Sequence, residues 1–465
     1  MNEYSPFENN FEDLKADDLS ALKNINEGWY IEYKQAIPKS TAIAKSISAF
    51  ANSYGGWIFY GIKEESKENS VAGEFIGIDI SELDAALQRI RQAVANLSPA
   101  CHFETRTLHG PSEIIGLDAN RAIICVVVPQ SIEAPHVHSS GYIYRRIADG
   151  SEPTPETDRH MIEKLFDRSK STISRYKKWH DLDPEFSEAE SNAPFLRIMI
   201  KPNLWRVPRS DFTFNIDSVR QTLGAKTGRP ICLPFDTVYP RAGGIIARQC
   251  HNNDPTNLSV TWDLRNDLTS DITIPLNWCK GTTQDIRRYL SGYKHSEEFV
   301  DKLEKANIKN TSVVDLNYVH YVLRGIIEAQ RELQLKAGWP LEFHLKIKLL
   351  NVWRTIPFLD LNHFLKNIDK NGIPMCLTSN VTAPPGHHPE TFVRIREFQN
   401  ADIEHSEAIG QTLLSFLPVA DAYGIPLYEI IAEADYSEDE KDGFFYTALT
   451  NAGSRAMEVQ KLRNN

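Results

Sequence analysis

The chain has 465 residues and a formal net charge of −11; 41% of its residues are hydrophobic and 24% are charged. This length predicts two or three domains, and the composition is typical of a folded globular protein and excludes a disordered one. The acidic balance excludes a protein coated in positive charge, but a local basic groove would still allow nucleic-acid binding.

No segment suggests a membrane, secretory or disulfide-stabilised protein. The longest apolar run, residues 122–128, is far shorter than the ~20 residues that a membrane helix needs. The acidic start, residues 1–18, has neither a basic region nor an apolar stretch, so we expect no secretory signal and a cytoplasmic protein. No two of the six cysteines have the C-x-x-C spacing of a zinc ribbon.

Helix and strand patterns alternate in the first part of the chain. Alternating side chains predict a strand over Tyr30–Gln35, and Ser40 or Thr41 caps a predicted helix that runs to Asn52. A glycine pair then ends the helix before an apolar, aromatic strand. The elements expected from there on are the strand Trp57–Ile62, a helix over Leu83–Leu97, the strands Arg121–Pro129 and Gly141–Ile147, and a helix from Asp158.

An acidic segment with two prolines, His180–Pro194, divides the chain and predicts a linker. We therefore expect an N-terminal domain over residues 1–179, a linker over 180–194 and a C-terminal α/β domain over 195–465. The fold class expected for the whole chain is α+β, with mixed α/β parts. Within the C-terminal domain we expect strands at Phe195–Lys201 and Ser259–Leu264, a long helix at Val314–Leu335, mixed strand and core signals at Leu341–Trp353 and a helix at Gln411–Tyr423.

The segment EGWYIEYK, Glu27–Lys34, holds the clearest candidate set of catalytic groups. Glu32 and Lys34 lie on one face of the predicted strand, and Glu27 lies near its entry. Carboxylates that are close together repel, and a divalent cation such as Mg²⁺ relieves the repulsion while it binds substrate phosphate oxygens. A lysine there can stabilise charge at a phosphate. The spacing alone, however, favours a solvated strand face with a salt bridge.

Two further segments can add to this set. If the strand Trp57–Ile62 lies beside the first strand, its end brings Glu64 or Glu65 to the other carboxylates; a helix-to-strand turn with a polar loop is the simpler interpretation. Arginines and an aromatic ring on one strand can contact phosphates and stack on a base. The residues expected to bind nucleic acid are Lys34, Tyr144, Arg145 and Arg146, together with Lys170, Arg175, Lys177 and Lys178 from the basic stretch Lys164–Lys178.

Taken together, these pieces resemble the AlbA-like domain of the Schlafen family. The matching pieces are Glu27, Glu32 and Lys34 at the start, then Ser48–Ile62, Arg121–His136 and Gly141–Arg159, in the same order and spacing. The resemblance extends from Glu27 to about Arg168. It implies a small mixed sheet flanked by helices, and nucleic-acid binding.

The resemblance also implies an active site. In Schlafen members that cut RNA, three carboxylates act with a divalent metal on transfer or ribosomal RNA. Glu27 and Glu32 match the first two carboxylates, whereas the third is usually an aspartate just after a G-V or G-I pair. Here that stretch reads Gly61-Ile62-Lys63-Glu64-Glu65, so Glu64 is the candidate. Mg²⁺ or Mn²⁺ is the expected cofactor.

Two functions follow from this resemblance, and the sequence leaves a third open. The first is a metal-dependent endoribonuclease acting on tRNA or other structured RNA, in bacterial anti-phage defence, with a C-terminal domain that senses a phage-derived trigger. A homodimer is expected, because vertebrate Schlafens pair two such domains. The second is a non-catalytic DNA- or RNA-binding transcriptional regulator, or an ATP-binding regulator. In the third, the C-terminal domain is the main functional unit, a sensor of protein or ligand.

Overall fold

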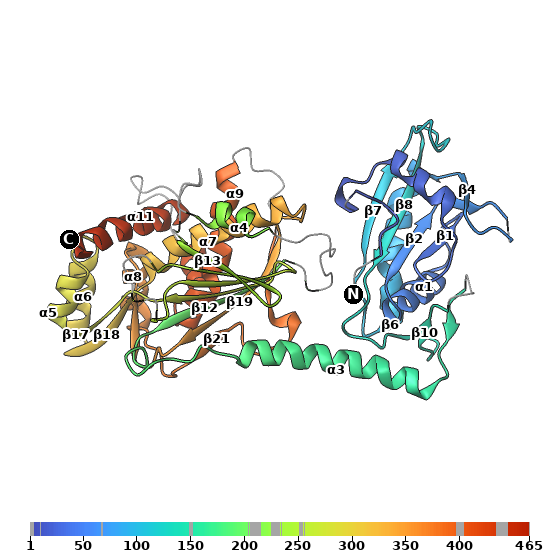
Figure 1. Ribbon diagram of the computed structural model, residues 1–465. Coiled ribbons are helices and arrows are strands. Elements are labelled where there is room, and N and C mark those ends of the chain that lie inside the picture. The colour runs from blue at the N-terminus through green and yellow to red at the C-terminus, as the bar shows by residue number, and fades with distance from the viewer. Residues whose placement is uncertain are drawn as a thin grey trace. The chain divides into compact units, whose positions relative to one another are not determined.

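The computed structural model describes residues 4–9, 11–66, 68–147, 152–202, 204, 215–224, 233, 235–250, 254, 256–396, 404–433 and 445–464. The chain forms two compact units, and the first unit ends at Asp181 where the second begins at Leu182 (Figure 1). Both units combine helices and sheets, so the fold class is α+β, as predicted.

The first unit is built around a small sheet. Its elements in chain order are η1 (Phe11–Asp13), η2 (Ala16–Asn24), β1 (Ile31–Lys34), α1 (Ser40–Asn52), β2 (Gly56–Tyr60), β3 (Ile62–Glu64), β4 (Ala72–Phe75), β5 (Ile78–Asp79), η3 (Ile80–Glu82), α2 (Leu83–Ala93), η4 (Val94–Asn96), β6 (Leu97–Ser98), β7 (Glu104–His109), β8 (Arg121–Val128), β9 (Val137–His138), β10 (Tyr144–Arg145), β11 (Thr154–Pro155) and α3 (Arg159–Asp181).

The sheet of the first unit is mixed, as the sequence predicts. β1 is an edge strand that pairs in parallel with β2, and β2 pairs in antiparallel with β8, which also pairs with β5 and β7. Alternation along β2 places Ile58 and Tyr60 against α1 and α2, whereas Trp57 and Phe59 pack against the N-terminal segment that contains η2. Apolar side chains therefore cover both faces of the sheet, and the open edge of β1 is left to the polar residues described below.

The local patterns predict β1, α1, β2, α2, β8 and α3 within a few residues, whereas β4, β5, β7 and most of the shorter elements were not predicted. Two predicted strands differ from the structure: Gly61, at φ +100°, divides the run Trp57–Ile62 between β2 and β3. The stretch Gly141–Ile147 contains only the short strand β10. Residues 148–151 of the Schlafen-like segment lie outside the described residues.

The second unit contains a larger antiparallel sheet. Its strands lie in the order β13-β14-β15-β16-β12-β19-β21, with β22 also paired to β19, and a second sheet has the order β17-β18-β20. The elements are β12 (Phe195–Lys201), α4 (Ile216–Leu223), β13 (Thr237–Arg241), β14 (Gly244–Arg248), β15 (Thr261–Arg265), β16 (Ser270–Pro275), β17 (Trp278–Thr282), α5 (Thr283–Tyr289), α6 (Ser296–Lys305), β18 (Asn310–Asp315), α7 (Leu316–Lys336), β19 (Phe343–Leu350), β20 (Thr355–Phe358), α8 (Asn362–Asn371), β21 (Val381–Ala383), η5 (Pro389–Thr391), β22 (Val393–Ile395), α9 (Glu404–Ala422), α10 (Leu427–Glu433) and α11 (Phe445–Asn464).

Most of the predicted linker packs with the second unit, which begins at Leu182. Asp183 accepts hydrogen bonds from Arg197 Nη1 (3.1 Å) and Lys348 Nζ (2.5 Å). Arg197 is itself buried and binds Asp271 through two nitrogens. The acidic segment is therefore anchored by buried cations on β12 and β19. Among the helices described, none is long and apolar enough to cross a membrane.

Candidate functional site

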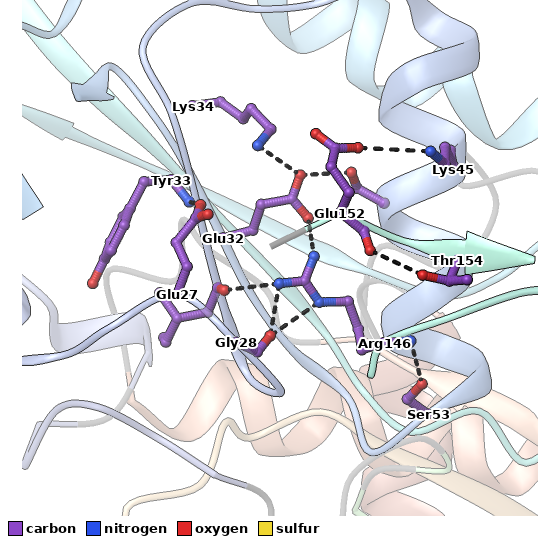
Figure 2. Close-up of polar contacts among 12 residues, drawn as sticks. Glu27, Gly28, Glu32, Tyr33, Lys34, Lys45, Ser53, Arg146, Glu152 and Thr154 are labelled. Carbon is purple, nitrogen blue, oxygen red and sulfur yellow. Dashed lines mark hydrogen bonds and ion pairs between the residues drawn. The ribbon is translucent and has the colours of Figure 1, made fainter. Parts of the chain in front are cut away.

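Glu27 bends back along the open edge of β1. The outward-facing backbone groups of an edge strand need partners from outside the sheet. Glu27 Oε1 accepts a hydrogen bond from the Tyr33 N–H, and the Gly28 N–H donates to the carbonyl of Ile31 (3.1 Å; Figure 2). The second carboxylate oxygen, Glu27 Oε2, is buried and has no hydrogen-bond partner in the described part of the chain.

Glu32 points towards α1 and is only 1% exposed. Its Oε1 accepts a hydrogen bond from Ser46 Oγ (2.7 Å) and lies 3.2 Å from Lys34 Nζ. Its Oε2 accepts a hydrogen bond from Arg146 Nη1 (3.0 Å). A buried carboxylate is tolerated only when it is paired and hydrogen-bonded, and these three donors meet that requirement.

Arg146 is a buried partner of this site. Its side chain is fully buried, lies over the Phe50 ring at 4.7 Å, and donates to the carbonyls of Gly28 and Ile31 as well as to Glu32 (Figure 2). The prediction that Arg146 contacts RNA is therefore wrong, because the guanidinium is enclosed by the domain itself. No local pattern indicates this pairing, because 114 positions separate Arg146 from Glu32.

Glu64, the last residue of β3, is the third carboxylate of the cluster. It is half-buried, and within the described residues its side chain makes no hydrogen bond or ion pair. Its negative charge acts on Glu27 together with that of Glu32. The neighbouring residues point elsewhere, because Lys63 pairs with Glu74 and the exposed Glu65 binds Asn69. The structure thus brings Glu64, and not Glu65, to Glu27.

Electrostatics make Glu27 the unusual group of the cluster. Burial raises the pKa of Glu27 from its ordinary value of 4.5 to about 8, and the charges of Glu64 and Glu32 add to this, against the opposing effects of Lys34 and the Tyr33 N–H. For Lys34, burial alone would lower the pKa, but the carboxylates of Glu32 and Glu27 outweigh it and raise the pKa. Lys34 therefore stays charged while Glu27 is held partly protonated near neutral pH.

The carboxylates of Glu27 and Glu64 are chemically suited to a hard divalent cation, although in the described residues the oxygens of Glu27, Glu32 and Glu64 do not all lie within 4.8 Å of one another. Mg²⁺ and Mn²⁺ prefer carboxylate oxygens, and a cation would supply the partner that the buried Glu27 Oε2 lacks. Glu64 adds a carboxylate without a competing partner in the described chain. Glu32 differs from both, because its two oxygens are already engaged by Ser46, Lys34 and Arg146.

Tyr144 and Arg145 do not form the expected nucleic-acid surface. The Tyr144 ring is buried, contacts the His138 ring edge-on at 5.4 Å and lies 5.2 Å below Lys45 Nζ. Arg145 Nη1 binds Glu156 Oε2 at 2.5 Å, and both side chains are largely buried. The prediction that these two residues contact RNA is therefore wrong. The Tyr144 ring packs against His138, and the charge of Arg145 is paired with Glu156.

The helix α3 has one buried apolar side and one exposed basic side. The apolar side of this helix is formed by Leu165, Tyr176 and Trp179, which are buried. The predicted RNA-binding residues on the helix are all exposed: Lys170, Arg175, Lys177 and Lys178.

Comparisons with known proteins identify the domain that carries this cluster. Residues 27–155 match the family model described as Schlafen, AlbA_2. A search of curated proteins found no match. Two solved structures are similar: the DIP2311 protein from Corynebacterium diphtheriae (15% identity, 35% of this chain and 35% of that chain, TM-score 0.20) and the N-terminal domain of a RecG-related protein from Nitrosomonas europaea (19%, 31% and 86%, 0.21).

The match to the Corynebacterium protein spans about a third of that protein's length. The family match contains all four residues of the cluster, namely Glu27, Glu32, Lys34 and Glu64. Residues 27–155 are a Schlafen AlbA_2 domain, which belongs to a nucleic-acid-related family.

Proposed function

We propose that the first unit is a metal-dependent endoribonuclease of Schlafen type that cleaves tRNA or other structured RNA. The observation that carries the proposal is the buried, partnerless Oε2 atom of Glu27, on which the charges of Glu32 and Glu64 act. An unpartnered buried polar atom costs about 1–3 kcal/mol, so it calls for an explanation, and a bound ion is one such explanation.

Each residue of the cluster has a distinct part in the proposed reaction. Glu27 and Glu64 would hold Mg²⁺ or Mn²⁺, and Glu32 would add its charge to the site. A divalent cation bound there supplies Lewis-acid stabilisation of phosphate charge and lowers the pKa of bound water. Lys34 is 30% exposed and stays protonated, so its ammonium can offset negative charge on the substrate phosphate. Arg146 positions Glu32 and does not touch substrate.

The exposed cations of α3 are proposed to bind the RNA backbone. Contacts of lysine and arginine with phosphates give affinity without sequence preference, and they weaken as salt rises. Substituting Lys177 and Lys178 together should weaken RNA binding uniformly across sequences and lower its salt dependence.

The proposal is tested with purified full-length protein, total tRNA and either Mn²⁺ or EDTA. Wild type is compared with Glu27→Gln, which keeps the acceptor for the Tyr33 N–H but loses the charge. Glu65→Gln is the matched control, since Glu65 is adjacent in sequence to Glu64 but exposed and outside the cluster. We expect discrete fragments with wild type and Glu65→Gln in Mn²⁺, and none in EDTA or with Glu27→Gln. Equal cleavage by Glu27→Gln would contradict the proposal.

One observation favours a second candidate, a non-catalytic nucleic-acid-binding regulator. Glu32 is saturated by three donors within the domain, and a metal ligand would have to release one of them. This candidate predicts salt-dependent RNA or DNA binding with no cleavage in Mn²⁺.

The assembly and the biological role belong to the same proposal and rest on the Schlafen resemblance. A homodimer would give twice the 52.8 kDa chain mass in light scattering, whereas a monomer at all micromolar concentrations would contradict it. The second unit would sense a phage-derived trigger in anti-phage defence. Phage protection by Glu27→Gln that equals wild type would remove the nuclease from that role.

A further inference from the structure

Four aromatic rings form a cluster at the entry to β1. Trp29 contacts Tyr54 edge-on at 5.3 Å, Tyr54 lies 6.4 Å from Tyr30, and Tyr30 stacks on Tyr4 at 4.7 Å. Tyr54 is 41% exposed, and the other three rings are partly exposed. We call these four residues the aromatic platform. Tyr4 and Tyr30 also pack against the core of the first unit, whereas Tyr54 and Trp29 form the outer, more accessible part of the cluster.

The turn that carries Tyr54 is held rigidly. Gln130 Nε2 donates to the Ser53 carbonyl at 2.7 Å, and Arg146 N donates to Ser53 Oγ at 2.9 Å. Gly55 follows with φ +77°, and a Cβ there would lie 2.8 Å from the Val128 carbonyl. The chain therefore fits tightly against the end of β8. A ring on a fixed turn loses little conformational entropy when it binds a flat ligand.

A cation accompanies the platform. Arg168 of α3 donates to the carbonyls of Ala51 (3.4 Å) and Asn52 (3.3 Å), at the C-terminal end of α1, and its charge interacts with Tyr54. In the described part of the chain no carboxylate pairs with Arg168. Aromatic rings beside a guanidinium without an acidic partner are complementary to a nucleotide, which combines a flat base with a negative phosphate.

The platform is also tied to the carboxylate cluster. Gly28 directly precedes Trp29, and its carbonyl accepts hydrogen bonds from Nε (3.0 Å) and Nη2 (2.6 Å) of Arg146. Nη1 of the same guanidinium binds Glu32 (Figure 2). One buried side chain therefore fixes the backbone next to Trp29 relative to Glu32. A nucleotide on the platform would lie within the same nucleic acid that reaches the cluster.

We propose that the aromatic platform stacks an unpaired base of single-stranded RNA, with Arg168 binding a neighbouring phosphate. The site selects loops or unpaired ends, because bases in a duplex are stacked on each other and cannot reach protein rings. The inference rests on the proposed function for its substrate, and it assigns the stacking role that the sequence had suggested for Tyr144. Tyr144 is too buried to fill that role.

The test measures RNA binding in EDTA, where the proposed cleavage cannot occur. Full-length protein is titrated into a single-stranded oligonucleotide and a duplex of the same sequence, each labelled for fluorescence anisotropy. Variants are Tyr54→Ala and Trp29→Ala, with Tyr239→Ala as the matched control, because Tyr239 of the second unit is 42% exposed. Circular dichroism confirms folding. 2-Aminopurine in the single strand reports stacking through the loss of its fluorescence.

We expect Tyr54→Ala and Trp29→Ala each to weaken single-strand binding about 5- to 150-fold and to reduce 2-aminopurine quenching. Tyr239→Ala should bind like wild type, and duplex binding should change little in all variants. Unchanged single-strand affinity in folded Tyr54→Ala and Trp29→Ala would overturn the inference. If Tyr54→Ala does not fold, Trp29→Ala and Tyr54→Phe, which keeps the ring and should bind like wild type, decide the question.

The two proposals fail separately. Cleavage of tRNA in Mn²⁺ with no effect of either substitution on binding would overturn the platform and leave the nuclease intact. Loss of single-strand binding in Tyr54→Ala, with no cleavage by wild type, would support the platform and overturn the nuclease.

Discussion

Removal of the Arg146 guanidinium tests the central contact of the first unit. In Arg146→Met the fully buried side chain keeps most of its volume but loses its donors to Glu32, Gly28 and Ile31. Glu32 then remains 99% buried with only Ser46 and Lys34 as partners. Breaking a buried ion pair by removing one partner costs about 3–5 kcal/mol. That is a large part of the ~5–15 kcal/mol that stabilises a typical domain.

The structure also predicts how much a second substitution restores. In Arg146→Met/Glu32→Leu the unpaired charge is gone, and replacing a buried pair by apolar groups is often neutral. The Gly28 carbonyl still lacks its donors, which costs about 1–3 kcal/mol. Ile31 keeps its hydrogen bond from the Gly28 N–H. We therefore expect the double variant to be about 2 kcal/mol more stable than Arg146→Met alone, the difference between these costs.

Hydrogen–deuterium exchange on the full chain measures this effect within the first unit. Amides of β2 and β8 report its opening free energy separately from that of the second unit. Arg159→Met is the control, because its ion pair with Glu163 is exposed and contributes about 0–1 kcal/mol. If Arg146→Met lowers the opening free energy by less than about 1 kcal/mol, or if the double variant is no more stable than the single one, the Arg146–Glu32 pair does not stabilise the first unit as described.

Three further predictions concern pH and packing. Since the pKa of Glu27 is raised from 4.5 to about 8, wild type should lose stability relative to Glu27→Gln as pH rises through this window, which urea denaturation at pH 5 and 8.5 checks. Burial lowers the pKa of Lys346 from 10.5 to about 8, so wild type should gain stability relative to Lys346→Met as pH rises from 8 to 10.5; a flat difference in thermal unfolding would contradict this. Gly56→Ala should destabilise the first unit by at least about 1–3 kcal/mol, because its Cβ would lie 2.4 Å from Phe50 and 2.7 Å from the Tyr30 carbonyl, and a wild-type melting profile would refute that packing.

Local patterns predicted the long helices and the strands β1, β2 and β8 of the first unit, because these depend on neighbours along the chain, but they missed the strand β7 beside β8. The helix expected to run to Asn52 begins at Ser40, as its spacing indicates, and the alternation over Tyr30–Gln35 corresponds to β1. The family resemblance likewise placed the domain, which the match to residues 27–155 confirms. Gly61 could not be assigned as a strand break, since its conformation depends on its contact with Gly77 across the fold.

The candidate site was only partly predictable, because its contacts are long-range. Lys34 pairs with Glu32, and the charges of Glu32, Lys34 and Glu64 act on Glu27; the role of these residues in catalysis stays a prediction. The two arginines within Gly141–Ile147 were predicted to bind phosphate. In the structure Arg145 pairs with Glu156 and Arg146 pairs with Glu32. The partnership of Arg146 with Glu32 depends on a fold that brings the residue after β10 to the side chains of β1, which no local pattern encodes.

Mn²⁺ binding is the measurement that bears most closely on the proposed metal site, because it needs no knowledge of the RNA substrate. Titration at pH 8.5, followed by electron paramagnetic resonance, would compare wild type with Glu27→Gln, Glu64→Gln and the control Glu65→Gln. We predict binding by wild type and Glu65→Gln, at least about tenfold weaker binding by Glu27→Gln and Glu64→Gln, and weaker binding by wild type at pH 6.5, where protons compete for Glu27. Equal affinity in all four proteins, or none in wild type, would contradict a metal-dependent nuclease.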